Sequence, residues 1–184
     1  MLFYEGLVSL ELARADGAKD NWIEIATKNI AKLKNFSQYA PENYTNKVIL
    51  LEAELAVVRN DMQKAKAHFE DAIKLSKKHG FIHEEALAYE REGLFFLETD
   101  SLDAAKISLR NAYLCYERWG AIALSKALIK NHPAVFDTKT MLALKPDSPI
   151  DLQIDKDADC SVSVLTEIPS TCLSLKRKRV RFKL

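Results

Sequence analysis

The most constraining feature of this chain is a long stretch without proline. Residues 42–132 contain no proline, and glycine interrupts them only at Gly80, Gly93 and Gly120. Proline breaks the interior of a helix and glycine weakens it, so their scarcity allows long uninterrupted helices. Hydrophobic residues make up 48% of the 184 residues, which is enough apolar side chain for a packed core. We therefore expect an all-α domain.

The proline-free stretch contains an internal repeat with an offset of 40 residues. Matched positions carry the same kind of side chain, small on small, large apolar on large apolar, and glycine on glycine. The matched pairs are Ala53 and Gly93, Ala65 and Ala105, Phe69 and Leu109, Ala72 and Ala112, and Gly80 and Gly120. A fixed period of this length indicates a stack of similar helical units.

Each unit is predicted to be a pair of antiparallel helices, 43–58 with 62–78 and 82–98 with a helix that ends at Trp119. Asp61 is suited to cap the second of these helices, and Asp100 or Ser101 the fourth. Gly80 and Gly120 are expected to end helices in the left-handed conformation. The apolar stripes of the second and fourth helices are Ala65, Phe69, Ala72, Ile73 and Ser76, then Ala105, Leu109, Ala112, Tyr113 and Tyr116.

Two earlier helices, near 2–14 and 20–38, form a further predicted pair, and a helix at 121–131 is expected to close the stack. The small–large–small pattern resembles the tetratricopeptide repeat, in which small residues let two helices cross closely. The match departs from that family in its period, 40 residues against about 34. It also has Glu52 and Glu92 where the family has leucine. The resemblance implies a right-handed stack of helical hairpins.

Several stretches within residues 3–131 carry a closer resemblance. The most specific is Arg118-Trp119-Gly120-Ala121, and the others include Tyr39-Ala40-Pro41-Glu42-Asn43 and His83-Glu84-Glu85-Ala86-Leu87-Ala88-Tyr89-Glu90. This part of the chain is similar to one helical region of large hybrid signalling proteins, which join a serine/threonine kinase-like domain, an AAA-type predicted ATPase, a GAF domain and often a histidine kinase. The sequence has no phosphate-binding loop and no kinase motif, so kinase and ATPase activity are not implied. Because Met1 falls inside a helical pattern, we expect a fragment of a longer protein.

The tetratricopeptide resemblance implies a groove lined by the first helix of each hairpin. The positions carried over are Lys47, Leu50, Glu54 and Val57 in one unit and Leu87, Glu90, Leu94 and Leu97 in the next. This groove would be apolar with acidic edges and would bind a protein, a peptide or a neighbouring domain of a parent protein. The alternative is that these residues pack against further repeats or domains.

No arrangement of residues predicts catalysis. His79 and His83 have the spacing of two metal ligands, but Gly80 between them is expected to end a helix. Cys115 lies near a helix C-terminus, where a thiolate is disfavoured, and is expected to be a buried structural thiol. We therefore expect a non-enzymatic protein with no catalytic residue, no cofactor and no metal.

The C-terminal part differs in composition from the helical block. Residues 133–175 contain four prolines and an excess of acidic residues, which predicts a disordered linker. Residues 176–184 carry six basic side chains and no acidic one. This end resembles a nuclear-localisation patch, and Arg179-Val180-Arg181-Phe182 resembles the Arg-Val-x-Phe docking motif for type 1 protein phosphatase. Partner-binding candidates here are Arg179, Val180 and Phe182, and a tail without function is the alternative.

These observations predict three parts: a tetratricopeptide-like helical domain over 1–132, a linker over 133–175 and a basic end over 176–184. The net charge of +1 gives no general attraction to nucleic acid, and no apolar run is long enough to span a membrane. We expect an interaction or regulatory module in the cytoplasm, with the nucleus as the alternative location.

Overall fold

The computed structural model describes residues 1–15 and 19–136, and these residues form helices joined by short connections. The helices are α1 (Leu2–Ala15), α2 (Lys19–Ser37), α3 (Pro41–Val58), α4 (Met62–Lys78), α5 (Ile82–Glu98), α6 (Leu102–Trp119) and α7 (Ile122–Asn131). The predicted all-α class is confirmed, and the predicted helices agree with these bounds to within a few residues. The predictions for residues 137–184, including the basic end, lie outside the described residues.

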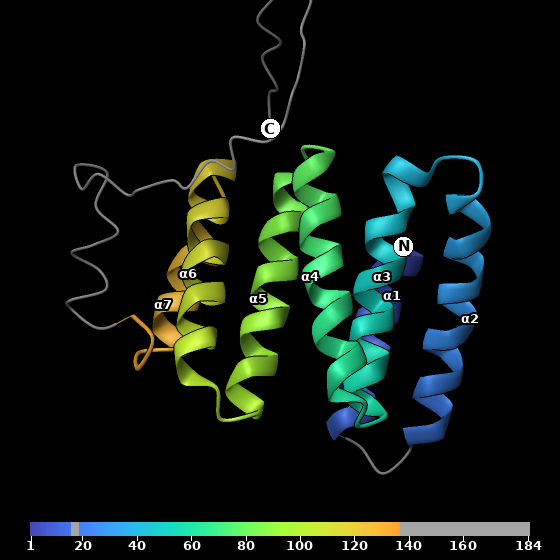
Figure 1. The fold of residues 1–184 in the computed structure, drawn as a ribbon, viewed down its shortest axis with the longest axis horizontal. Coiled ribbons are helices and arrows are strands. Elements are labelled where there is room, and N and C mark those ends of the chain that lie inside the picture. Colours follow the sequence, from blue (N-terminus) through green and yellow to red (C-terminus); the bar gives the residue numbers. More distant parts are fainter. Residues whose placement is uncertain (16–18, 137–184) are drawn as a thin grey trace, which may run out of the picture. The chain divides into compact units, whose positions relative to one another are not determined.

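The helices form consecutive antiparallel hairpins, and each hairpin packs on the next one along the chain (Figure 1). α1 pairs with α2, α3 with α4, and α5 with α6, while α2 packs against α3 and α4 against α5. α7 packs against α6, and α1 also packs against α3. Among residues 1–15 and 19–136, no helix is both long and apolar enough to cross a membrane.

Helix ends follow the predicted capping residues in most places. Asp61 accepts a hydrogen bond from the Lys64 backbone N–H at 3.2 Å, which confirms it as the cap of α4. Gly80 and Gly120 adopt φ angles of +73° and +83°, as expected for left-handed helix stops. Of the two candidates for α6, Ser101 occupies the N-cap position, but its side chain makes no hydrogen bond to the helix. Asp100 instead makes the preceding turn, with a φ of +55°.

The core repeats from hairpin to hairpin as the matched positions predicted. The buried residues of α4 are the five of its predicted stripe. In α6 the predicted stripe is buried except for Tyr113, which is half-buried. Phe69 packs on Phe95 of the next hairpin with ring centroids 5.6 Å apart, so large side chains fill the space between units.

The packed domain extends beyond the boundary predicted at residue 132. Val135 and Phe136 are 1% and 6% exposed and belong to the core cluster that includes Leu109, Tyr116 and Leu128. Pro133 follows the C-cap residue of α7, and the turn after it brings two apolar side chains back onto the core. The first residues of the predicted linker are therefore part of the helical domain.

Candidate functional site

The first half of the predicted groove is closed by α1. Leu50, Glu54 and Val57 are 2%, 1% and 9% exposed, so these three residues of α3 do not form an open surface. Their burial follows from the packing of α1 against α3, which the repeat pattern did not predict because the first hairpin lacks clear matched positions. Val57 retains contact with a cavity of about 480 Å³ that Arg14 and Glu98 also line.

The second half of the predicted groove lies on α5 and is partly open. Leu87, Glu90, Leu94 and Leu97 are all half-buried. Leu97 packs against the core cluster around Leu109, whereas Leu87 lines a surface cavity. Positions 87, 90 and 94 are three and four residues apart, so they share one face of α5.

Aromatic and aliphatic side chains from α1, α5, α6 and α7 surround this face of α5. A cavity of about 130 Å³ is lined by Tyr4, His83, Leu87, Tyr116, Trp119 and Leu124. A neighbouring cavity of about 400 Å³ shares Tyr4 and His83 and continues toward Phe36, Tyr44 and Lys47. Four of these large side chains remain well exposed: Tyr4 at 59%, Trp119 at 49%, Phe36 at 47% and Leu124 at 45%.

Val8 belongs to the same surface. Tyr4, Val8 and Glu11 follow one another at helical spacing on α1, so they share one face. Tyr4 lines the cavity with His83, and Glu11 forms an ion pair with Arg91 of α5 at 2.6 Å. Val8 therefore lies between two residues that face α5, and it is 58% exposed. We call this surface the α5 groove, defined by Tyr4, Val8, Leu87, Glu90, Leu94, Trp119 and Leu124.

The sequence prediction missed Tyr4, Val8, Trp119 and Leu124. Tyr4 and Val8 lie on a helix with only a weak repeat match, and Leu124 lies on the closing helix, which was expected only to cover the stack. The available signal was the large apolar residues outside the buried stripes. Such residues are informative only when tertiary packing shows that they gather on one surface.

One polar contact lies inside the α5 groove. The Tyr116 hydroxyl donates a hydrogen bond to Glu90 Oε2 at 2.6 Å. Burial, followed by the Glu90 carboxylate, raises the pKa of Tyr116 far above its usual value, so the phenol stays protonated and remains a donor. This bond fixes the Glu90 carboxylate beside apolar side chains.

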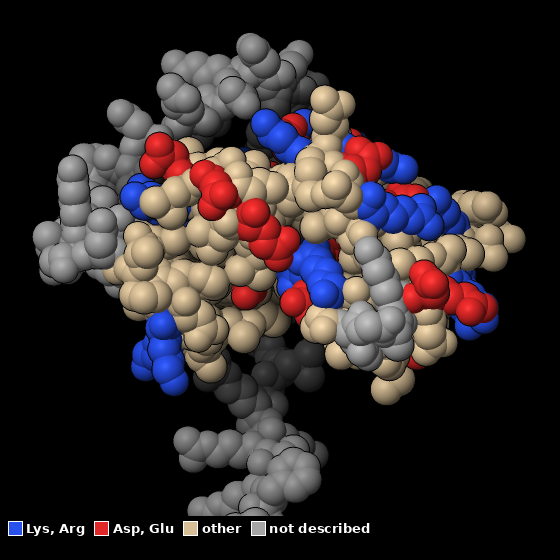
Figure 2. Space-filling view, turned by 90° about the horizontal axis from the view of Figure 1, so that it is seen from below, with Lys and Arg blue, Asp and Glu red and all other residues tan. Residues whose placement is uncertain are grey.

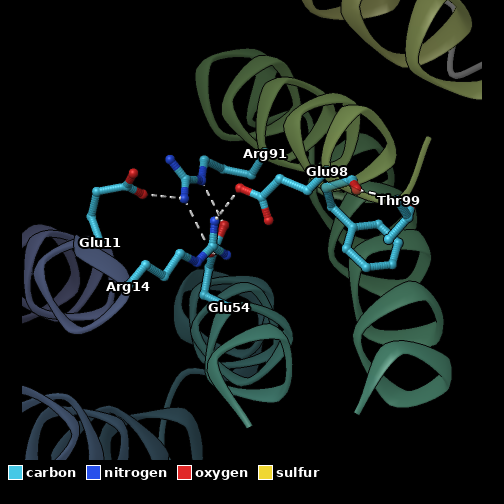
Figure 3. Close-up of polar contacts among 7 residues, drawn as sticks. Glu11, Arg14, Glu54, Arg91, Glu98 and Thr99 are labelled. Carbon is cyan, nitrogen blue, oxygen red and sulfur yellow. Dashed lines mark hydrogen bonds and ion pairs between the residues drawn. The ribbon is translucent and has the colours of Figure 1, made fainter. Parts of the chain in front are cut away.

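A network of ion pairs joins α1, α3 and α5 (Figure 3). Glu54 lies between two arginines, with Arg14 bonded to one carboxylate oxygen and Arg91 Nε to the other at 2.6 Å. Each arginine also reaches an exposed carboxylate, Arg14 to Glu98 at 3.2 Å and Arg91 to Glu11 at 2.6 Å. Although Glu54 was predicted to contact a partner, its charge is compensated within the chain by α1 and α5.

Lys47 is compensated in a similar way. Its ammonium group lies 2.6 Å from Glu84 Oε1 and within 6 Å of the Tyr44 and Phe81 ring centroids. The other Glu84 oxygen accepts a hydrogen bond from the buried side chain of Asn46, which also donates to Ser76 Oγ at 3.0 Å. This cluster joins α3, α4 and α5. Lys47 is thus a link between helices with 20% of its side chain exposed.

Two further residues that the sequence singled out are Cys115 and His83. Cys115 is buried, and burial together with the nearby Glu85 raises the pKa of its thiol to about 12. His83 stacks near Trp119 with ring centroids 5.4 Å apart and faces Glu84 at 3.3 Å. No group of three or more potential metal ligands is found among residues 1–15 and 19–136. Arg179, Val180 and Phe182 lie outside the described residues.

The charged side chains do not form a single-sign surface on the face shown in Figure 2. Acidic and basic side chains lie interspersed among uncharged ones there.

No family model, no curated protein and no solved structure matches this chain. The α5 groove, its apolar walls and the Glu90 carboxylate are therefore the observations on which a functional proposal depends.

Proposed function

We propose that this chain is a non-enzymatic interaction module that binds a protein segment in the α5 groove. The observation that supports it is the gathering of exposed Tyr4, Val8, Trp119 and Leu124 around the half-buried floor of α5. Large apolar side chains that gather on a surface, with polar groups at the rim, are typical of protein-binding sites. The resemblance to the helical region of hybrid kinase and ATPase proteins agrees with a regulatory role for this surface.

A selection from a random dodecapeptide phage library tests this proposal. The full chain is immobilised and compared with a variant that carries Val8→Asp and Leu124→Asp. Both side chains are largely exposed, so the variant should fold, which circular dichroism and urea unfolding check. The selected peptides are then synthesised and titrated by calorimetry. We expect peptides that bind the wild type and lose at least about tenfold in affinity for the variant.

Leu102→Asp combined with Ile107→Asp is the matched control. The two side chains are 44% and 63% exposed on α6 and are not part of the groove, so this variant adds the same two negative charges elsewhere. It should leave peptide affinity unchanged. If no peptide binds the wild type, or if all variants bind equally, the groove is not a binding site for peptides.

The sequence supports a second proposal for the C-terminal end. Arg179-Val180-Arg181-Phe182 matches the Arg-Val-x-Phe pattern, in which valine and phenylalanine enter two pockets of type 1 protein phosphatase. We expect purified phosphatase to bind the full chain and to lose binding when Val180 and Phe182 are both changed to alanine. Changing Lys176 and Lys178 to alanine should only weaken binding. Absence of binding to the wild type would exclude this role.

A further inference from the structure

We propose that the α5 groove selects a peptide segment in which a lysine or arginine lies between large apolar side chains, with Glu90 binding the cation. This inference rests on the proposed function, since it specifies the partner of the same groove. It follows from the charge balance around α5, from the position of Glu90 among apolar walls, and from what an unsuitable partner would leave unpaired.

The charge balance singles out Glu90. Glu54 is paired with two arginines, and Glu84 is paired with Lys47. Glu90 accepts a hydrogen bond from Tyr116, but among the described residues no lysine, arginine or histidine lies within ion-pair distance of it. Among the described residues, Glu85 and Glu92 of α5 also lack an ion-pair partner, but they are only 8% and 7% exposed. Glu90 is therefore the unpaired carboxylate of α5 that lies half-buried in the groove.

The surroundings of Glu90 strengthen an added ion pair. Leu87 and Leu94 lie on the same face of α5, three residues before and four residues after it. Tyr116 holds one carboxylate oxygen in place and lines the cavity with Tyr4 and Trp119. A cation that enters such a partly apolar site meets a positioned acceptor with little competing water, so the charge-assisted hydrogen bond is stronger than on an open surface.

Other partners would fit less well. A purely apolar segment over Leu87 and Leu94 would cover the Glu90 carboxylate without a cation, which carries a desolvation penalty. An acidic segment would place like charges together. The adjacent network joins three carboxylates, Glu11, Glu54 and Glu98, to two arginines, so it keeps one net negative charge, which also favours a basic segment. Charge complementarity therefore favours a basic residue between apolar anchors.

The test repeats the dodecapeptide selection in parallel on the wild type, Glu90→Gln and Glu24→Gln. The amide oxygen introduced by Glu90→Gln can still accept the Tyr116 hydrogen bond, so the fold should be preserved, and unfolding in urea checks this. Glu24→Gln removes the same charge from an exposed position of α2 that is paired with Lys28. One wild-type peptide is then synthesised with its basic residue and with norleucine in its place, and both forms are titrated calorimetrically.

We expect the wild type and Glu24→Gln to enrich lysine or arginine beside leucine, phenylalanine or tryptophan, and Glu90→Gln to lose the basic preference. The basic peptide should bind the wild type about tenfold or more tightly than Glu90→Gln, and the norleucine peptide should not distinguish them. Groove-dependent peptides without a basic preference would overturn this inference and leave the proposed function standing. If no peptide depends on Val8 and Leu124, the proposed function itself fails, and this inference fails with it.

Discussion

Gly93 on α5 lies so close to Leu109 on α6 that a β-carbon at residue 93 would be 2.6 Å from Leu109 Cγ and 2.8 Å from Cδ2. The Leu109 backbone nitrogen would lie at 3.3 Å. Both helices of the last hairpin therefore cross at a point where even one methyl group has no room. This contact explains why the repeat has a small residue at this position.

Gly93→Ala should destabilise the domain. The added methyl group overlaps Leu109, and the loss from overpacking exceeds the gain in helix propensity of about 1 kcal/mol. We expect a net loss of about 1–2 kcal/mol in the free energy of unfolding, measured from urea denaturation. In a Leu109→Ala background the loss should be much smaller, because only the backbone nitrogen at 3.3 Å then remains close. An equal loss in both backgrounds would contradict the steric explanation.

Glu54→Gln should lower the stability of the domain more than a charge change on the surface does. It removes the carboxylate that compensates Arg14 and Arg91, whose side chains are only 18% and 17% exposed. The two arginines then keep only the exposed carboxylates of Glu98 and Glu11 as partners. Breaking a buried ion pair from one side costs about 3 kcal/mol. The urea midpoint of the variant should fall accordingly, whereas Glu24→Gln should leave it unchanged. Similar midpoints for both variants would show that the network does not contribute to stability.

Stability should depend on pH through Glu92. Burial raises the pKa of this carboxyl, and the hydrogen bond from Ser108 Oγ at 2.7 Å only partly opposes the shift. The raised pKa means that the protonated form is favoured in the folded state. The stabilisation from this group is therefore present below its unfolded pKa and is lost as the pH rises through its folded pKa.

Glu92→Gln isolates this effect because glutamine resembles the protonated acid. The stability of the variant relative to the wild type should increase between pH 4 and pH 7, as measured by urea unfolding at several pH values. A difference that is constant with pH, or that changes in the opposite direction, would show that Glu92 does not titrate as described.

The Cys115 thiol should be unreactive in the folded protein. Its pKa is raised to about 12, so the thiolate fraction at pH 8 is about 10⁻⁴. In a Cys160→Ser/Cys172→Ser background, Cys115 is the one remaining cysteine of the sequence. Its reaction with Ellman's reagent should be about a thousandfold slower in buffer than in unfolding concentrations of urea. Equal rates would place the thiol at the surface.

The elements of this fold could be predicted because their signals are local. Gly80 and Gly120 end helices through their own conformational freedom, Asp61 caps through its own carboxylate, and the α4 stripe follows helical spacing. The closed half of the groove could not be predicted, because the burial of Leu50 and Glu54 depends on where α1 packs. A glutamate side chain such as that of Glu54 is normally solvated. Only the approach of arginines from 40 residues before and 37 residues after makes Glu54 a core residue.

The position of Glu54 has a consequence for how the domain unfolds. Stacks of hairpins usually have nearest-neighbour energetics, so that a terminal unit can fray while the others remain intact. Here one carboxylate on the middle hairpin holds arginines of the hairpins before and after it. Detaching either outer hairpin removes a counter-charge from the middle one. Amide hydrogen exchange in α1, α3 and α5 should therefore report a single shared opening, which makes the array one cooperative unit.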